Sequence, residues 1–195
     1  MMNRIHLGIA SLFVSALFSL PALAAAENYT LDPNHTNIVW SANHFGFSTV
    51  YGKFANVQGT LTLDEAKPEN SKVTVTVSPA NIVTGIDKFD AHLKSDAFFD
   101  VAKFPTATFE STRVEVIQPS KTAKVYGNLT LHGVTKPIIL NVTLNKIGES
   151  PVTRKKTAGF SATTVIKRSD FGMTFALPGV SDDILLTIES EASAS

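Results

Sequence analysis

The segment Lys72-Val-Thr-Val-Thr-Val-Ser78 decides the fold class, because apolar and polar residues alternate strictly along it. Successive side chains of a β-strand point to opposite faces, so its valines share one face and its threonines the other. Three later segments repeat the pattern, with the apolar sets Val125/Gly127/Leu129/Leu131, Ile138/Leu140/Val142/Leu144 and Ile184/Leu186/Ile188. The sequence therefore predicts an all-β, antiparallel protein.

Other stretches extend this prediction to roughly eight or nine strands in one domain. The further strands are expected at Tyr29–Leu31, Asn37–Asn43, Gly52–Leu63, Thr106–Ile117 and Gly159–Lys167, with turns at His132-Gly133, Gly148–Pro151 and Leu177–Gly179. A barrel and a sandwich both fit such a strand set. The length of Gly52–Leu63 and Thr106–Ile117 favours a barrel, whose strands are tilted and coiled.

The first residues predict a secretory signal peptide. Arg4 precedes an apolar run over 7–20, which Pro21 ends, and Ala22-Leu-Ala24 supplies small residues for cleavage. We expect residues 1–24 to be removed, with 26 as the latest cleavage position, leaving one domain over 25–195.

The charge balance and the cysteine count restrict the function classes. The whole chain carries 17 basic and 17 acidic residues, so losing Arg4 leaves 17 − 1 = 16 basic against 17 acidic residues, a net charge of −1. This balance gives no electrostatic reason to bind nucleic acid or an anionic membrane. The chain has no cysteine, which excludes disulfides and thiol catalysis.

A non-alternating segment, Asp87–Pro105, interrupts the strands. Phe89 and Leu93 would share one face of a short helix, and Asp90 and Lys94 would form an ion pair beside it. The helix over 87–95 is therefore expected to be a lid or gate on a barrel, followed by an aromatic-rich corner.

Phenylalanine is the favoured lining of the expected apolar cavity. Two of the 13 phenylalanines lie in the expected signal peptide, so 13 − 2 = 11 remain in the mature chain. Those interleaved with glycines and turns are the candidates for lining the cavity. They are Phe45, Phe47, Phe54, Phe98, Phe99 and Phe109. For any single one, a plain core position is the alternative.

The histidines and Arg168 are the remaining candidates for chemistry. His35, His44, His92 and His132 lack the short spacing of metal ligands, so no metal site is predicted. His92 either hydrogen-bonds a ligand head group or braces the lid. Arg168 either forms a structural pair with Asp170 or anchors a polar ligand head. No serine lies in a nucleophile elbow, so no enzyme activity and no catalytic residue is predicted.

Several motifs, in order along the chain, resemble those of the YceI-like family of exported lipocalin-like proteins. The resemblance covers about Tyr29 to Glu191. It rests on Leu31-Asp-Pro-Asn-His35, Ser41-Ala-Asn-His-Phe-Gly-Phe-Ser-Thr-Val-Tyr-Gly-Lys-Phe54, the segment Asp87–Asp100, Phe104-Pro105, Phe109-Glu-Ser111, Gly127-Asn-Leu-Thr-Leu-His-Gly-Val-Thr-Lys-Pro137, Gly159-Phe-Ser-Ala162 and Arg168-Ser-Asp-Phe-Gly172. The family commonly has arginine at the position of Phe89.

The resemblance implies an eight-stranded antiparallel, lipocalin-like barrel in the bacterial periplasm. Its cavity would hold a long-chain isoprenoid or isoprenoid quinone, with no cofactor required and no stable membrane insertion. The expected ligand-binding residues are Trp40, His44, Phe45, Phe47, Phe54, His92, Phe98, Phe99, Phe109 and Arg168. A homodimer and an inner-membrane respiratory partner are further expectations.

Two alternatives stay open at this point. One is a binder of fatty-acid derivatives. The other is a solid barrel that acts as a protein–protein interaction module, with Trp40, Tyr51 and the Phe45–Phe47 loop as its partner-binding patch.

Overall fold

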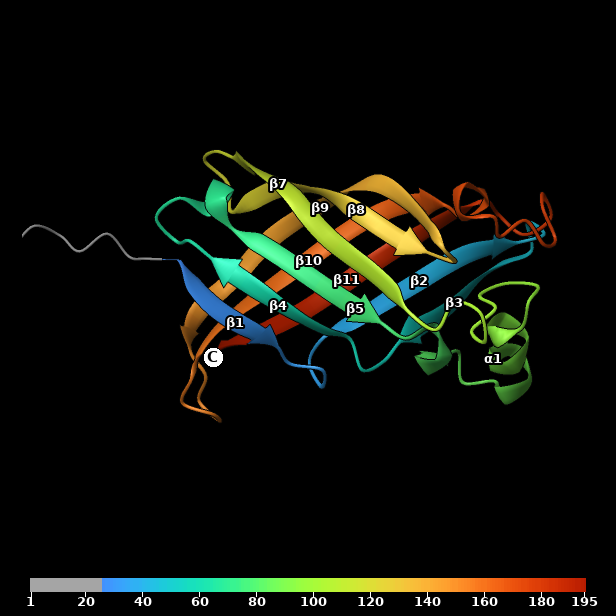
Figure 1. The fold of residues 1–195 in the computed structure, drawn as a ribbon, viewed down its shortest axis with the longest axis horizontal. Coiled ribbons are helices and arrows are strands. Elements are labelled where there is room, and N and C mark those ends of the chain that lie inside the picture. Colours follow the sequence, from blue (N-terminus) through green and yellow to red (C-terminus); the bar gives the residue numbers. More distant parts are fainter. Residues whose placement is uncertain (1–25) are drawn as a thin grey trace, which may run out of the picture.

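A computed structural model describes residues 26–195, so the predicted signal peptide lies outside the described residues. The chain forms one antiparallel sheet that closes on itself (Figure 1). Its strands are β1 (Glu27–Leu31), β2 (Asn37–His44), β3 (Ser48–Phe54), β4 (Gln58–Leu63), β5 (Lys72–Val77), β6 (Ile82–Val83), β7 (Ala107–Ile117), β8 (Thr122–Leu131), β9 (Val134–Glu149), β10 (Lys156–Lys167) and β11 (Asp183–Ala194). One α-helix, α1 (Asp87–Lys94), and three short 3-10 helices, η1 (Pro68–Asn70), η2 (Pro79–Asn81) and η3 (Arg168–Phe171), complete it.

The eleven strand segments form eight strand lines, because three lines are interrupted. β1 and β2 both pair with β11. On their other side, β1 pairs with β4 and β2 pairs with β3. Beyond these, β4 pairs with β5 and β3 pairs with β6. The remaining lines run β5–β7–β8–β9–β10–β11, which closes the ring. The structure is thus the predicted eight-stranded antiparallel barrel.

The prediction of one continuous strand over Gly52–Leu63 is wrong. β3 ends at Phe54 and β4 begins at Gln58, and Asn56 between them has a φ of 54°. This left-handed conformation breaks the extended backbone, and asparagine tolerates it better than most residues. The predicted turn at His132-Gly133 is confirmed: both residues have positive φ, as a two-residue hairpin turn requires.

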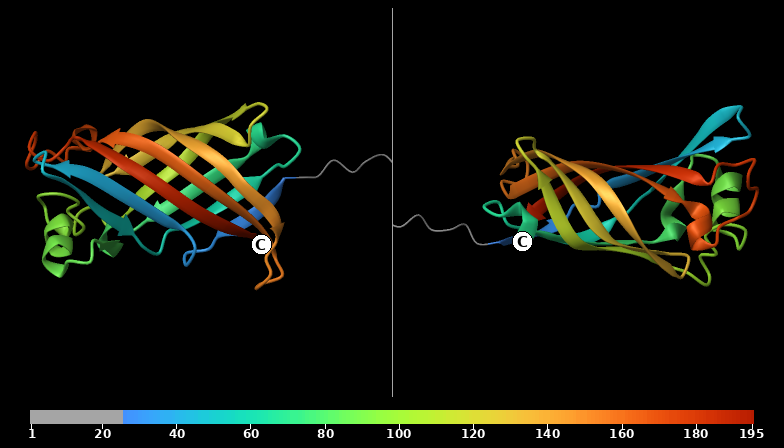
Figure 2. Two further views of the ribbon diagram at one scale, coloured as in Figure 1. Left: turned by 180° about the vertical axis from the view of Figure 1, so that it is seen from behind. Right: turned by 90° about the horizontal axis from the view of Figure 1, so that it is seen from above.

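One end of the barrel is closed by side chains. Leu131, Ile166, Phe171 and Met173 form one buried cluster there. A second joins Trp40, Ala42 and Ile82 to Leu93 of α1. In both views of Figure 2, α1 lies at the same end as the β2–β3 turn and the loop after η3. The expected short helix is therefore present as part of an apolar plug.

Asp90 fixes α1 to the barrel. Its Oδ1 accepts a hydrogen bond from the Thr84 amide at 2.8 Å and another from the Thr84 hydroxyl at 2.5 Å. The predicted ion pair between Asp90 and Lys94 is not among the ion pairs within residues 26–195. The carboxylate instead satisfies the backbone where the chain leaves β6, because Thr84 directly follows that strand.

The break between β1 and β2 contains an exposed ion pair. The Nδ1 of His35 donates to the Asp32 carboxylate at 2.6 Å. This hydrogen bond raises the pKa of His35 and lowers the pKa of Asp32 from their ordinary values. The pair therefore stabilises the fold above the ordinary pKa of aspartate, about 4, and below that of histidine, about 6.5. That contribution is lost as pH rises through the raised pKa of His35 or falls through the lowered pKa of Asp32.

We expect Asp32→Asn to lower the pKa of His35 toward its ordinary value, because the charged acceptor is removed. An NMR titration of the His35 imidazole measures this directly. Asp64→Asn, at an exposed carboxylate that bonds its own turn, is the control and should leave His35 unchanged. An unaltered pKa of His35 in Asp32→Asn would contradict the assignment.

Candidate ligand cavity

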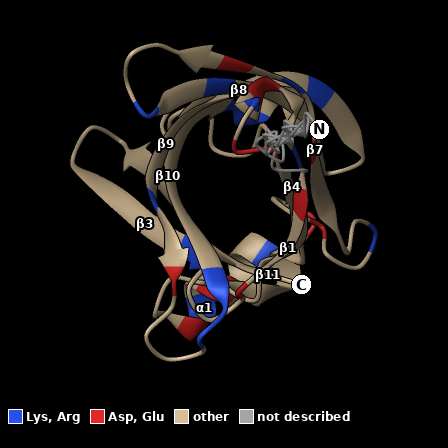
Figure 3. Cartoon of the chain, turned by 90° about the vertical axis from the view of Figure 1, so that its left-hand side faces the viewer, with Lys and Arg blue, Asp and Glu red and all other residues tan. Residues whose placement is uncertain are grey.

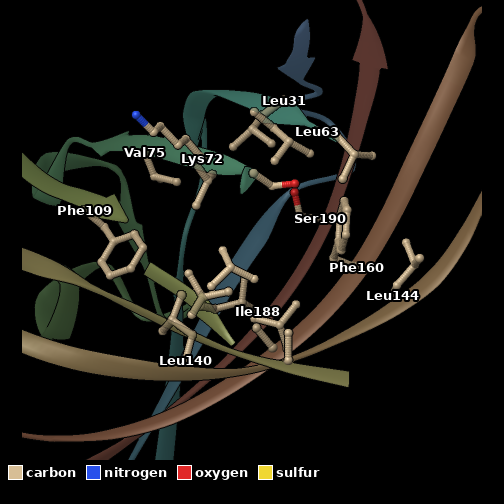
Figure 4. Close-up of a pocket in the computed structure, with 18 of the residues that line it drawn as sticks. Leu31, Leu63, Lys72, Val75, Phe109, Leu140, Leu144, Phe160, Ile188 and Ser190 are labelled. Carbon is tan, nitrogen blue, oxygen red and sulfur yellow. The ribbon is translucent and has the colours of Figure 1, made fainter. Parts of the chain in front are cut away.

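The barrel encloses an elongated cavity of about 490 Å³. Aliphatic side chains from most of the strands line it, and Figure 4 shows them converging on a common space. They include the predicted alternating sets, with Val73, Val75 and Val77 from β5, Val125 and Leu129 from β8, Ile138, Leu140, Val142 and Leu144 from β9, and Leu186 and Ile188 from β11. The cavity contradicts the solid-barrel alternative.

Few polar atoms lie deep in the cavity, and these have partners. The Thr36 hydroxyl lies 3.3 Å from the Ser190 hydroxyl and donates to the Glu191 carbonyl oxygen at 3.4 Å. Both Thr36 and Ser190 border the cavity. Because these groups are already hydrogen-bonded, the inner wall acts toward a ligand as an apolar surface.

The cavity ends blindly at the plugged end of the barrel. Ala107, Leu129, Ile138 and Leu186 border the cavity, and all four also belong to or contact the Phe171 cluster. No residue of α1 is among the lining residues. The helix therefore packs behind the floor of the cavity, and the structure gives it no position at the entrance, where a gate would act.

The mouth of the cavity lies at the opposite end. Figure 3 looks along the barrel from this end and shows the strands as a closed ring. The cavity is bordered here by residues of the β4–β5 and β7–β8 turns, which meet where η1 contacts β7. These rim residues are Glu65, Pro68, Ser71, Lys72, Gln118, Ser120, Lys121 and Thr122. Most of the polar lining is therefore concentrated at the entrance.

The charges at the mouth leave two lysines without a carboxylate. The Lys156 ammonium nitrogen lies 2.8 Å from a carboxylate oxygen of Glu27 and 2.6 Å from one of Glu65. The hydrogen bond to Glu27 has the largest effect in raising the pKa of Lys156, and the hydrogen bond to Glu65 raises it further. Neither Lys72 nor Lys121 forms an ion pair with any carboxylate of the described chain, 26–195. In Figure 4 the Lys72 nitrogen points away from Leu140 and Ile188. The rim is therefore locally cationic.

Of the ten residues expected from sequence to bind ligand, Phe109 lines the cavity. Trp40, Phe54, Phe98 and Phe99 instead belong to or pack against the plug cluster with Leu93, where the Phe54 and Phe99 rings meet edge-on at 5.6 Å. These four aromatic residues lie behind the floor of the cavity, and their part in ligand binding stays a prediction.

Trp40 is packed tightly within the plug. Its indole packs on Gly52, where a side chain would overlap the ring. The centroids of the Trp40 and Phe89 rings lie 6.4 Å apart. Its buried Nε1 has no hydrogen-bond partner among the described residues. Phe89 is thus an apolar member of this plug.

His44, Phe45, Phe47 and His92 lie at the outer surface of the plugged end. Phe47 is 91% exposed and Phe45 is 54% exposed, at the tip of the β2–β3 hairpin. The His44 ring meets the Phe45 ring edge-on at 4.7 Å. His92 contacts the rings of Phe98 and Phe175 at 5.1 and 5.5 Å. None of the four lines the cavity, and a role in ligand binding stays a prediction.

Arg168 is buried beside the loop that follows η3. Its guanidinium donates to four backbone carbonyl oxygens, those of Met173, Phe175, Val180 and Ser181, at 2.8–3.0 Å. Burial lowers its pKa and the charge of Asp182 raises it. Four of its five N–H groups are therefore engaged by this loop. The predicted pair with Asp170 is absent from the ion pairs of residues 26–195.

The residues that sequence reasoning missed are the aliphatic ones and Phe160. The phenylalanine content favoured an aromatic lining. The alternation of valine, leucine and isoleucine nevertheless places these residues together on one face of each strand. Phe160 lies within the predicted strand over 159–167 and borders the cavity. Strand periodicity thus identifies the lining, because in a closed barrel every second residue of each strand faces the interior.

The comparison with protein families decides the relationship, because a model described as the YceI-like domain matches residues 29–192. The chain belongs to the YceI-like family. The YceI protein of Salmonella agona is 40% identical over 181 residues, covering 92% of this chain and 93% of the relative. A UPF0312 protein of Pseudomonas putida is 41% identical over 161 residues, covering 82% of each.

Three solved structures have a similar fold. The YCEI protein of Campylobacter jejuni is 35% identical, with a TM-score of 0.69 and coverage of 78% of this chain and 90% of that one. Burkholderia cenocepacia BcnA has a TM-score of 0.74 at 20% identity, covering 83% and 98%. A domain from Saccharophagus degradans, described as polyisoprenoid-binding, has a TM-score of 0.66 at 15% identity, covering 86% and 98%. The last two comparisons support the fold alone.

Two other features are absent from the part of this YceI-like chain that the structure describes. Within residues 26–195, no three His, Asp or Glu side chains are grouped closely enough to hold a metal ion. No helix of the same residues is long and apolar enough to cross a membrane.

Proposed function

We propose that this protein binds a long-chain isoprenoid, either a polyprenyl lipid or an isoprenoid quinone, without chemical turnover. The observation that carries the proposal is the blind, aliphatic cavity inside the barrel. Burial of apolar surface stabilises a complex by roughly 25 cal/mol per Å². A chain of isoprene units therefore needs no polar contact inside. The polyisoprenoid-binding description of one structural neighbour supports the same ligand class.

The chain enters tail first in this proposal, with its polar head at the mouth. The floor is made of Ala107, Leu129, Ile138 and Leu186, so a polar head buried there would lose its hydrogen bonds to water. At the rim, Gln118 and the two unpaired lysines offer donors beside water. Head-group preference is therefore a property of the rim, and the plug contributes none.

The proposed setting is the periplasm, after removal of the signal peptide expected from residues 1–24. A carrier there holds its lipid in a water-filled compartment, where a free isoprenoid chain is insoluble. Exchange of the lipid with an inner-membrane respiratory partner is part of this proposal.

The decisive experiment is native mass spectrometry of the protein purified from its own periplasm, followed by organic extraction and lipid identification. The expected result is one isoprenoid lipid per chain, released on extraction. A fatty-acid derivative in the same amount would support the alternative binder. An empty protein that also fails to take up added geranylgeraniol, ubiquinone or palmitate would overturn the carrier function.

The lysines at the rim make a prediction about head groups. We expect the double change Lys72→Gln and Lys121→Gln to weaken binding of geranylgeranyl phosphate about tenfold, because each lysine contributes a modest, screened attraction. Binding of geranylgeraniol, which has the same chain without charge, should stay within about twofold. Titration calorimetry at low and moderate salt measures both. Lys88→Gln, on α1 at the plugged end, is the control, and equal losses for the two lipids would contradict the prediction.

A further inference from the structure

Phe109 occupies a special position in the cavity, just above its floor. It lies two residues from Ala107 on the same face of β7 and pairs across the ladder with Leu129. Ala107 and Leu129 both join the cluster that closes the barrel. Phe109 is therefore the last aromatic lining residue that a chain meets before it reaches the floor.

A glycine on the neighbouring strand holds the Phe109 ring against the wall. A Cβ atom at position 127 would overlap the Phe109 ring and would lie 2.6 Å from the Glu110 carbonyl oxygen. Gly127 belongs to the inward-facing set of β8, so its missing side chain leaves a recess that the ring fills. The ring thus has one place to lie, and its free face borders the cavity.

We propose that Phe109 sets the depth of the cavity, and so the number of isoprene units that it holds, and that Gly127 fixes the ring in that position. This inference rests on the proposed isoprenoid-binding function. Each methylene group that the cavity buries raises the affinity about fourfold, so the affinity rises with every added isoprene unit that fits. It stops rising once the chain reaches the floor. A smaller residue at position 109 moves that limit deeper, and a larger one moves it toward the mouth.

The test measures dissociation constants of geraniol, farnesol, geranylgeraniol and geranylfarnesol, prenols that each add one isoprene unit, for the mature protein and its variants. Phe109→Ala should extend the rise in affinity by about one isoprene unit, because the lost ring has about the volume of that unit. Phe109→Trp should end the rise earlier by less than one unit, because an indole adds fewer atoms to a phenyl ring than an isoprene unit contains. Gly127→Ala should displace the ring into the cavity and also lower the midpoint of thermal unfolding, because its Cβ meets the Glu110 carbonyl oxygen at 2.6 Å as well as the ring.

Phe160→Ala is the matched control. Phe160 pairs with Leu144, whose amide donates to the Lys121 carbonyl oxygen at the mouth, so its ring lies near the entrance. Figure 4 shows the Phe109 and Phe160 rings on opposite sides of the cavity. Removing the Phe160 ring should weaken all the prenols together and leave the limiting length unchanged.

Each outcome decides the inference. A limit that moves with position 109 and stays with position 160 supports it. The same limit in the wild type, Phe109→Ala and Phe109→Trp overturns it, provided that thermal unfolding shows all three folded. If the wild type binds no prenol at all, the proposed function fails first, which is a distinguishable result.

Discussion

Ala162→Trp is expected to weaken binding of geranylgeraniol by at least about a hundredfold. Ala162 is buried on β10, facing the cavity between Val142 and Ile188 on the two flanking strands. An indole there fills space that the ligand chain would occupy, and excluding four methylene groups already costs about 3 kcal/mol of binding. Titration calorimetry measures the loss.

Stability separates this effect from misfolding. The new indole fills an existing cavity, so the free energy of unfolding should stay the same or rise. Thr163→Trp is the matched control, because Thr163 is the next residue on β10 and faces outward. It should bind geranylgeraniol as the wild type does. Undiminished binding by a folded Ala162→Trp variant would place the ligand outside the barrel.

Arg168→Ala should lower the free energy of unfolding by about 3–5 kcal/mol, because several buried acceptors lose their hydrogen bonds and each unsatisfied group costs about 1–3 kcal/mol. The change leaves the carbonyl oxygens of Met173, Phe175, Val180 and Ser181 without their shared donor. The midpoint of thermal unfolding should fall by about 10 °C. Urea denaturation followed by circular dichroism gives the free energy directly.

Two further variants define the role of Arg168. Lys167→Ala removes an exposed neighbour that pairs with Asp183 at the surface, and it should leave stability almost unchanged. Arg168→Lys should recover part of the loss, because an ammonium group has three donors for four carbonyls. Wild-type stability in Arg168→Ala would show that the loop does not depend on the guanidinium. Weaker binding of charged lipids alone, with stability unchanged, would restore the head-group interpretation.

The sequence was a reliable guide wherever local periodicity decides the outcome. Val73, Val75 and Val77 share one face as predicted, and the structure shows that this face lines the cavity, as does the alternating set of β9. The break between β3 and β4 lies where the alternation shifts by one residue, because the inward positions are even-numbered before it, at Gly52 and Phe54, and odd-numbered after it, at Leu61. The prediction of one continuous strand overlooked this shift. The break depends on the backbone conformation of Asn56, which tertiary pairing with β2 and β1 selects.

The candidate site was harder to predict than the fold. Aromatic residues fill both cavities and plugs, and sequence alone does not say which end of a barrel a phenylalanine reaches. Phe98 and Phe99 lie in the plug because the chain after α1 turns back over the closed end, which is a property of the whole topology. The hydrogen-bond partners of Arg168 were likewise not predictable. They are backbone carbonyl oxygens, which every residue carries, so the sequence does not distinguish them.

The interruption of three strand lines divides the barrel into a stiff half and a soft half. β7 to β11 form ladders of 10 to 16 residues, whereas β1 to β6 are segments of 2 to 8 residues. Short ladders open locally at a lower free-energy cost than long ones. Local opening of the barrel wall is therefore expected first in β1 to β6, while the long strands keep the rest of the barrel closed.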